Sequence, residues 1–357
     1  MDTRKNEVAE TSPIVIVAAF VIVIAGVIYA KSIITPFLLA LFISIICEQP
    51  VSWMEKRRIP RWLGLIIVIF SMIFLFSGFA FLIGDTISSF SGDLSKYEAS
   101  LTAISDSFFK YLGDKGIKVP QDQVFSLLQP AKILEITAGA LNKLVNMMGN
   151  TFLILLIVLF TLTEFSSFAV KANAILKGSD RSVSYFSSIL QNIRHYLGIK
   201  TVICLFTGIL VYIALLIIGV DYPLLWALIA AIMNYIPNIG SIIAAVPAVL
   251  FALVQIGWGG AIWTLASFMV VNNVLGNFVE PRIMGRGLGL STLVVFLSLL
   301  FWGFIFGTVG MFLSVPLTMT IKIILEQNEK TKWISIILGT PSEAEILLKK
   351  EERNEKK

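Results

Sequence analysis

Charged residues are scarce in this chain, which argues first of all against a soluble fold. Only 14% of the 357 residues are Asp, Glu, Lys or Arg, whereas 57% are hydrophobic. An average soluble domain carries about 25% charged residues. Several apolar runs reach the length of roughly 20 residues that a helix needs to cross a bilayer. We therefore expect an all-α, polytopic membrane protein whose first partner is the lipid bilayer.

Histidine and cysteine are nearly absent. The chain has one histidine, His195, and two cysteines, Cys47 and Cys204. Zinc sites draw on several Cys and His side chains, and two cysteines in or beside apolar runs do not indicate a disulfide framework. HExxH, GxSxG and Walker A motifs are missing as well. The sequence thus predicts no enzyme, no metal site and no cofactor.

The net charge of +5 does not indicate a nucleic-acid partner, because the basic residues lie in segments beside apolar runs. Lys and Arg outnumber acidic residues in 48–61 and in 170–200. Loops of this kind face the cytoplasm, so both termini are predicted to be cytoplasmic. Apolar residues at helical spacing in 178–197 predict an amphipathic helix on the cytoplasmic surface.

The apolar segments divide into single crossings and two longer, interrupted segments. Six are predicted to cross the membrane once: 14–30, 33–47, 62–84, 149–169, 198–219 and 259–279. Residues 85–148 mix polar and apolar residues and predict a small helical extracytoplasmic subdomain, for which a packing or assembly role is favoured over ligand binding. The resulting divisions are 1–84, 85–148, 149–197, 198–256, 257–325 and a charged cytoplasmic tail, 326–357.

Glycine and proline interrupt the two longer segments, 222–256 and 290–325. The interrupting residues are Pro237 and Gly240 in the first segment, and Gly303, Gly307 and Gly310 in the second. The arms are short against a hydrocarbon core about 30 Å thick, so both segments are predicted to be re-entrant hairpins. Two complete crossings per segment would satisfy the topology equally well and stay open as the alternative. Asn238 and Ser241 are expected to cap backbone groups that the first break frees.

The interrupted segments also suggest an inverted repeat. Residues 198–256 and 257–325 each pair one crossing helix with one interrupted segment, and the two pairs start on opposite sides of the membrane. The motif Ile239-Gly240 with Val246-Pro247 in the first is echoed by Val309-Gly310 with Val315-Pro316 in the second. Paired interruptions in corresponding halves point to the substrate site of a transporter.

Polar residues within the apolar segments extend this candidate site. Asn273, Asn277 and Glu280 are spaced so that they share one face of a helix. Amides at this depth either hydrogen-bond between helices or line a substrate route, and both interpretations stay open. The predicted substrate pathway comprises Asn234, Pro237, Asn238, Gly240, Ser241, Asn273, Asn277, Gly307 and Gly310.

Three charged residues are candidates for gating or ion coupling: Glu164, Glu280 and Arg282. A carboxylate within a transmembrane segment is a functional candidate by default, although Glu164 lies near enough to a helix end to reach the headgroups. Glu280 and Arg282 flank Pro281 in a compact charged corner. That corner is interpreted either as a helix stop with an interfacial ion pair or as a latch that changes partners during transport.

Three stretches carry a family resemblance. They are YIPNIGSIIAAVPAVL, NNVLGNFVEPRIMGRGLGLSTLVVFLSLLFWGFIFGTVGMFLSVPL and the early run PFLLALFISIICEQPV. With them the chain resembles the AI-2E (autoinducer-2 exporter) family of prokaryotic inner-membrane proteins, although residues 45–51 keep only Pro50-Val51 of the family pattern. The resemblance implies a homo-oligomeric transporter. One branch of the family exports the small furanosyl signal autoinducer-2, and other members are associated with exchange of sodium or lithium for protons.

These observations predict a carrier that exports a small polar solute, with autoinducer-2 as a candidate, through two broken-helix hairpins. A sodium (or lithium)/proton antiporter is the first alternative, in which a monovalent cation is the cargo and Glu164 or Glu280 titrates. A non-transport membrane scaffold built on residues 85–148 is the second. It ranks last, because a scaffold does not require helix breaks within the membrane.

Overall fold

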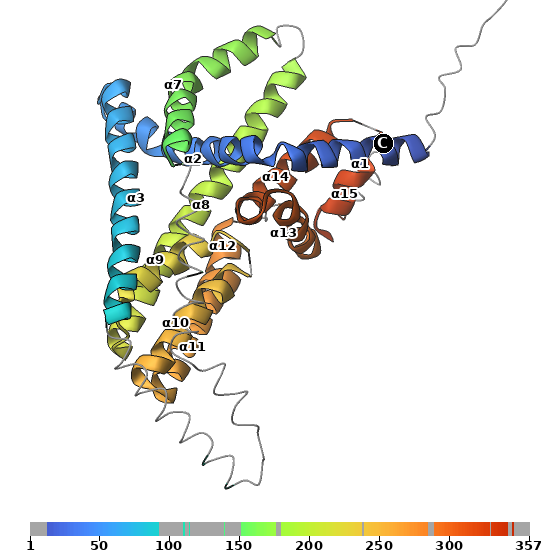
Figure 1. The fold of residues 1–357 in the computed structure, drawn as a ribbon. Helices are drawn as coiled ribbons and strands as arrows, with labels where there is room; N and C mark the ends of the chain where they lie inside the picture. Colours follow the sequence, from blue (N-terminus) through green and yellow to red (C-terminus); the bar gives the residue numbers. More distant parts are fainter. Residues whose placement is uncertain are drawn as a thin grey trace, which may run out of the picture.

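The described part of the chain is helical throughout. The computed structural model describes residues 13–92, 151–175, 180–284 and 289–341, except 238 and 329, with a few isolated positions elsewhere. These ranges contain no β-strand, so the predicted all-α class is confirmed. The elements, labelled in Figure 1, are α1 (Pro13–Tyr29), α2 (Lys31–Lys56), α3 (Arg61–Gly92), α7 (Thr151–Ile175), α8 (Asp180–Ile218), α9 (Pro223–Met233), α10 (Gly240–Ile256), α11 (Trp258–Asn272), the π-helix η1 (Asn273–Val279), α12 (Glu280–Met284), α13 (Thr292–Phe306), α14 (Thr308–Glu326) and α15 (Lys332–Leu338).

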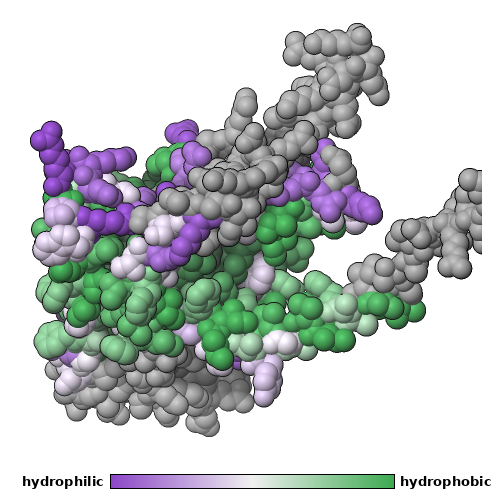
Figure 2. Space-filling model, turned by 90° about the horizontal axis from the view of Figure 1, so that it is seen from above, coloured by the Kyte–Doolittle hydropathy of each residue, from purple (hydrophilic) through white to green (hydrophobic). Residues whose placement is uncertain are grey.

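The helices and the surface have the character of a multi-pass membrane protein. Among the described residues, five helical stretches are long and apolar enough to cross a membrane: Lys31–Lys56, Arg61–Thr86, Ile189–Ile218, Trp258–Ile283 and Thr308–Glu326. The predicted crossings 14–30 and 149–169 correspond to shorter apolar helices, Val17–Tyr29 and Thr151–Glu164. Figure 2 shows a broad band of hydrophobic residues with hydrophilic residues gathered along one edge. Such a band is suited to contact with lipid.

Helix α2 runs on through a region predicted to be a loop. It continues to Lys56 with Pro50 inside it, so the connection to α3 is reduced to residues 57–60. Val51 is 1% exposed and packs in a cluster with residues of α3 and α7, and Glu48 pairs with Arg61 of α3. These tertiary contacts stabilise helix where the polar, proline-containing sequence alone favours a loop.

The predicted surface helix 178–197 is not a separate element. It joins the following crossing in one helix of 39 residues, α8. Ile193, Tyr196 and Leu197 are buried in a cluster with residues of α2 and α14. Near residue 197, one face of α8 therefore packs on these two helices, and the predicted boundary after residue 197 falls within a continuous helix.

Three hydrophobic clusters hold the helices together, and α2, α3 and α8 each take part in two of them. The first joins α2 to α3 and α7. The second joins α2 to α8 and α14. The third packs α8 against α3, α9, α10 and α11. In Figure 1 these helices form the body of the molecule, and α1 projects from it.

Both long segments break at predicted positions, although in the second segment only Gly307 interrupts the helix, and Gly303 and Gly310 lie inside α13 and α14. Helix α9 ends at Met233 and α10 begins at Gly240. Helix α13 ends at Phe306 and α14 begins at Thr308, with Gly307 between them at φ 66°. Glycine adopts this left-handed conformation without the steric penalty that other residues meet. The two arms of each segment pack against each other, so we name the pairs α9–α10 and α13–α14 the first and second helix pairs.

A glycine in the second arm of each helix pair lets the arms touch through their backbones. A Cβ atom at Gly240 would lie 1.8 Å from the carbonyl oxygen of Met233, and one at Gly310 would lie 1.9 Å from that of Trp302. No side chain fits at such distances. The glycine of the motif, Gly240 in the first half and Gly310 in the second, therefore has the same packing role in both.

The predicted subdomain 85–148 lies almost wholly outside the described residues. Its first residues, up to Gly92, continue α3. The beginning of the predicted tail contains α15, whose Leu338 carbonyl accepts a hydrogen bond from the Ser291 amide at 3.1 Å. That bond holds α15 beside the start of α13.

Alanine at either arm-contact glycine is expected to destabilise the fold. In Gly240→Ala or Gly310→Ala the added methyl group overlaps a backbone carbonyl, and overpacking of this kind costs about 1–3 kcal/mol. The matched control is Gly259→Ala in α11, where a Cβ atom meets nothing within 4 Å. Thermal unfolding of the purified protein in detergent should show a lower Tm for the first two variants only. Equal Tm values for all three would contradict the backbone contact.

Candidate functional site

The turn between α9 and α10 is anchored to α8 by side-chain hydrogen bonds. Asn234 Nδ2 donates to Thr207 Oγ1 at 3.1 Å, and Tyr235 OH donates to Thr201 Oγ1 at 2.7 Å. Asn234 is only 9% exposed. A buried amide without a partner is costly, so these bonds fix the turn against one face of α8.

An ion pair is buried on the same helix. Lys200 Nζ lies 3.0 and 2.9 Å from the two carboxylate oxygens of Glu280 at the start of α12. The Lys200 side chain is 4% exposed and the Glu280 side chain 19% exposed. Removing one partner of such a pair leaves an uncompensated buried charge. The pair therefore favours one relative position of α8 and α12.

The ion pair and the anchored turn belong to one polar region. Lys200, Cys204 and Thr207 lie at spacing i, i+4 and i+7, which places them on one face of α8. Asn234 reaches this face, because its Nδ2 bonds Thr207 and also lies 3.6 Å from Cys204 Sγ. We name the whole region the polar seam; its members are Lys200, Thr201, Cys204, Thr207, Asn234, Tyr235 and Glu280.

The two helix pairs meet beside the polar seam. The ring centroids of Tyr235, in the turn of the first pair, and Phe312, in the second arm of the second pair, are 6.1 Å apart. Ile236 is buried in the cluster against which Met311 and Phe312 pack. The two interrupted segments are therefore in contact, and the contact is at the break of the first.

A π-helix separates Glu280 from the two asparagines that were expected to share its face. The segment η1 covers Asn273–Val279, between α11 and α12. Asn277 Nδ2 donates to Asn273 Oδ1 at 2.8 Å, and Asn273 Nδ2 donates to the Met269 carbonyl at 2.9 Å. Both asparagines are exposed. The wider turn of a π-helix changes the direction of the residues that follow it. Glu280 therefore contacts α8, while Asn273 and Asn277, which we name the asparagine ladder, stay at the surface.

The other predicted charged residues lie apart from the polar seam. Glu164 is 53% exposed and pairs with Lys171 of its own helix, α7. Arg282 is exposed, and within the described ranges it forms no ion pair. Glu280 and Arg282 therefore do not pair with each other in the charged corner, because Glu280 pairs with Lys200 of α8.

The remaining residues of the predicted pathway shape the two breaks. Pro237 is partly buried within the turn, and Asn238 lies outside the described residues. The capping role expected of Ser241 is not observed: Ile239 occupies the N-cap position of α10, and no side chain caps it. Gly307 allows the sharp second break, and Gly240 and Gly310 allow the arm contacts described above.

In the part of the chain that the structure describes, three buried charged residues, Lys200, Glu48 and Lys322, are not predicted as site residues from the sequence. Lys200 counts there among the cytoplasmic basic residues, although the polar stripe that it forms in an apolar helix is a signal that could identify it. Glu48 is 6% exposed, and Arg61 Nη2 lies 3.1 Å from its Oε2 and donates to the Leu162 carbonyl at 3.1 Å. This second buried pair joins α2, α3 and α7.

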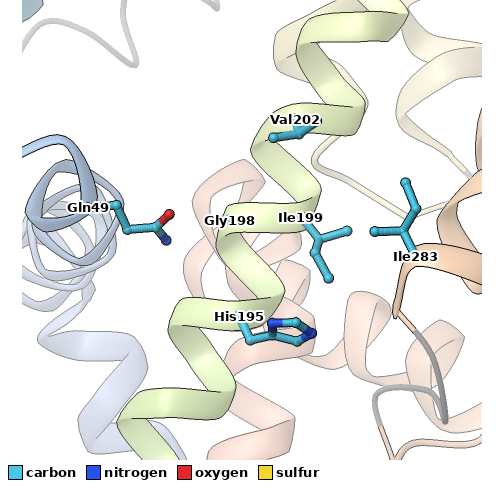
Figure 3. A pocket seen from close by; sticks show the side chains of 6 residues that line it. All are labelled: Gln49, His195, Gly198, Ile199, Val202 and Ile283. Carbon is cyan, nitrogen blue, oxygen red and sulfur yellow. The ribbon is translucent and has the colours of Figure 1, made fainter. Parts of the chain in front are cut away.

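A pocket of about 330 Å³ lies next to the polar seam, between α2, α8 and α12. It is lined by Gln49, His195, Gly198, Ile199, Val202 and Ile283 (Figure 3). Ile199 precedes Lys200, and Ile283 follows Glu280 by one helical turn. The pocket and the ion pair therefore flank the same contact between α8 and α12. Among the described residues, no group of three or more His, Cys, Asp or Glu side chains could hold a metal ion.

Comparison with known proteins yields matches over nearly the whole chain. The family model described as AI-2E family transporter matches residues 16–330. The AI-2 transport protein TqsA of Escherichia coli strain K12 is 37% identical, over 91% of this chain and 95% of its own. A Haemophilus influenzae protein assigned by its name to transport is 38% identical, over 90% of this chain and 94% of its own. YhhT of Escherichia coli strain K12, also named for transport, is 34% identical, over 90% of this chain and 92% of its own.

Breaking the buried ion pair is expected to cost more than removing either residue of an exposed pair. Loss of one partner of a buried pair costs about 3–5 kcal/mol. Glu280→Leu should lower the free energy of unfolding more than Lys200→Met does, because it leaves Lys200, the more deeply buried charge, without its partner. The double variant Lys200→Met/Glu280→Leu should recover most of the stability. Denaturant or thermal unfolding in detergent measures the stabilities of the three variants and so ranks them.

The matched control for this series is Lys171→Met, which removes one partner of the exposed Glu164 pair. Exposed pairs contribute less than about 1 kcal/mol, so little change is expected. If the double variant is as unstable as the sum of the two single variants, the two charges do not interact as the geometry indicates.

Proposed function

Because the chain belongs to the AI-2E transporter family, we propose that it is a carrier that exports a small polar solute across the inner membrane, with autoinducer-2 as the candidate solute. It works as a homo-oligomer with both termini in the cytoplasm. The observation that carries the proposal is the meeting of two interrupted helix pairs beside a buried polar seam. Interrupted helices in corresponding halves of a transporter typically surround its substrate.

The polar seam supplies the groups that a polar solute needs within the membrane. Asn234 and Tyr235 come from the break of the first helix pair, and Lys200 and Glu280 lie beside them on α8 and α12. Each of these side chains is occupied by a protein partner in this conformation. A solute that replaces one such partner would keep the buried group hydrogen-bonded, and this exchange is the proposed binding step.

Glu280 is the proposed gating residue. Its bond to Lys200 joins residues 198–256 to residues 257–325, as does the packing of Tyr235 against Phe312. A relative movement of the two halves has to break or re-form these contacts. We propose that the Lys200–Glu280 pair opens once per cycle, which makes Lys200 as important as Glu280. Arg282, exposed two residues after Glu280, is an alternative partner for Glu280 only after a rearrangement of α12.

The candidate solute is taken from one relative. The Escherichia coli protein TqsA, at 37% identity over nearly the whole chain, is named as an AI-2 transport protein. No described feature favours the sodium/proton alternative, since Glu164 is exposed and paired and Glu280 is paired with a lysine. Membership of a transporter family gives no support to the scaffold alternative either.

The proposal is tested by efflux of autoinducer-2 from liposomes that contain the purified protein. Asn234→Leu removes the hydrogen bonds of the turn at nearly constant volume and should lower the flux about tenfold or more. Asn277→Leu is the matched control: it makes the same substitution on the exposed asparagine ladder and should retain the flux. Size-exclusion profiles and Tm values establish that both variants are folded.

Two outcomes would contradict this proposal. Wild-type liposomes that release autoinducer-2 no faster than empty ones would exclude it as the cargo. A flux abolished by Asn277→Leu and unaffected by Asn234→Leu would move the route from the polar seam to the outer face of η1.

A further inference from the structure

The pocket between α2, α8 and α12 is lined by two polar side chains, one glycine and three aliphatic side chains. Its polar side chains are Gln49 and His195, and its remaining lining is Gly198, Ile199, Val202 and Ile283. Asp, Glu, Lys and Arg are absent from the described residues that line it. Figure 3 shows Gln49 directed at α8 from one side, and Ile283 directed toward Ile199 from the other.

The two polar side chains retain hydrogen-bonding capacity. Gln49 Nε2 donates to the Arg194 carbonyl at 3.1 Å, which orients the amide and leaves Oε1 as an acceptor. His195 is exposed, and it makes no hydrogen bond to a described residue. A neutral imidazole offers one donor and one acceptor. The pocket can therefore bond hydroxyl groups in either direction, and its described lining offers no Asp, Glu, Lys or Arg side chain to balance an ion.

Gly198 is what allows the amide to lie this close to α8. A Cβ atom at this position would lie 3.0 Å from Gln49 Nε2 and 3.1 Å from Oε1. An alanine there would push the amide away and alter the polar side of the pocket. The position of Gln49 is thus set by the Arg194 carbonyl on one side and by the absence of a side chain on the other.

We propose that this pocket is a binding site for a small, uncharged, hydroxylated molecule, at which the solute docks before it reaches the polar seam. The inference rests on the proposed function. A volume of about 330 Å³ lies within the range of small-molecule sites. Hydroxyl groups bond Gln49 and His195, and the carbon skeleton packs on Ile199, Val202 and Ile283. The docked molecule lies against the helices whose contact the Lys200–Glu280 pair maintains.

The pocket is lined by both helices that the ion pair joins. Ile199 and Val202 belong to α8, and Ile283 belongs to α12. A ligand that touches both helices, and that binds one of their arrangements more tightly, changes the free energy of their relative movement. Occupancy of the pocket is therefore coupled to the same rearrangement that opens the ion pair.

The binding test uses the protection of a cysteine on purified full-length protein. Ile283→Cys places a thiol in the pocket lining, and Arg282→Cys places one on the adjacent, exposed position of the same helix. The probe is autoinducer-2 in borate-free buffer, in which it carries no charge. Mass spectrometry of the peptide containing the introduced cysteine measures its modification by N-ethylmaleimide. The probe should slow the reaction at position 283 about fivefold or more and leave position 282 nearly unaffected.

The transport test uses the pocket histidine. His195→Phe removes both hydrogen-bonding atoms and should raise the half-saturating concentration of autoinducer-2 about tenfold while the maximal flux is retained. His195→Gln keeps a donor and an acceptor and should restore most of the affinity. A merely structural role for His195 would instead lower the maximal flux and the Tm in both variants.

The two measurements separate this inference from the proposed function. If position 283 is not protected while wild-type liposomes transport autoinducer-2, the pocket inference is overturned and the transport proposal stands. If position 283 is protected but no flux is seen, the binding site stands, autoinducer-2 is excluded as cargo, and docking on the transport route is overturned. An unchanged half-saturating concentration in His195→Phe contradicts docking on the transport route.

Discussion

The burial of Lys200 opposite Glu280 is the interaction on which the rest of the site depends. An ammonium group with a 4% exposed side chain requires an acceptor, so α12 has to approach α8 at this point. The π-helix η1 precedes α12 and sets the direction in which Glu280 points. The turn 234–239 lies on the same face of α8 through Asn234 and Tyr235. Breaking the pair would therefore loosen the place where the two halves of the transport region meet.

Contacts within each helix pair differ in kind from contacts between the halves. Gly240 and Gly310 bring the backbones of paired arms together, where no side-chain rearrangement can relax them. Between residues 198–256 and 257–325 lie the Lys200–Glu280 ion pair, the contact of Tyr235 with Phe312, and the hydrophobic packing of α11 against α8 and α10. These contacts are made by side chains, which can rearrange when one half moves against the other while each helix pair remains intact. The small pocket beside the ion pair lies where such movement changes its walls.

The helical class and the two helix breaks follow from local signals in the sequence, since glycine and proline act on the backbone where they stand. The ion pair does not follow, because its members are 80 residues apart and Lys200 resembles any basic residue near a helix end. Glu48 and Pro50 suggest a loop until the packing of α2 on α3 and α7 is seen. The expectation that Asn277 and Glu280 share a face assumes an α-helix. The π-helix Asn273–Val279 has more residues per turn, so the two side chains point in different directions.

The most direct test is the autoinducer-2 flux through liposomes that contain the charge-exchanged variant Lys200→Glu/Glu280→Lys. Each single reversal places two like charges side by side and should abolish the flux. The exchanged pair restores an attraction across the same contact, so it is expected to recover a measurable part of the flux. Full flux in both single variants would contradict a gating role for the pair, as would a folded exchanged variant with no flux.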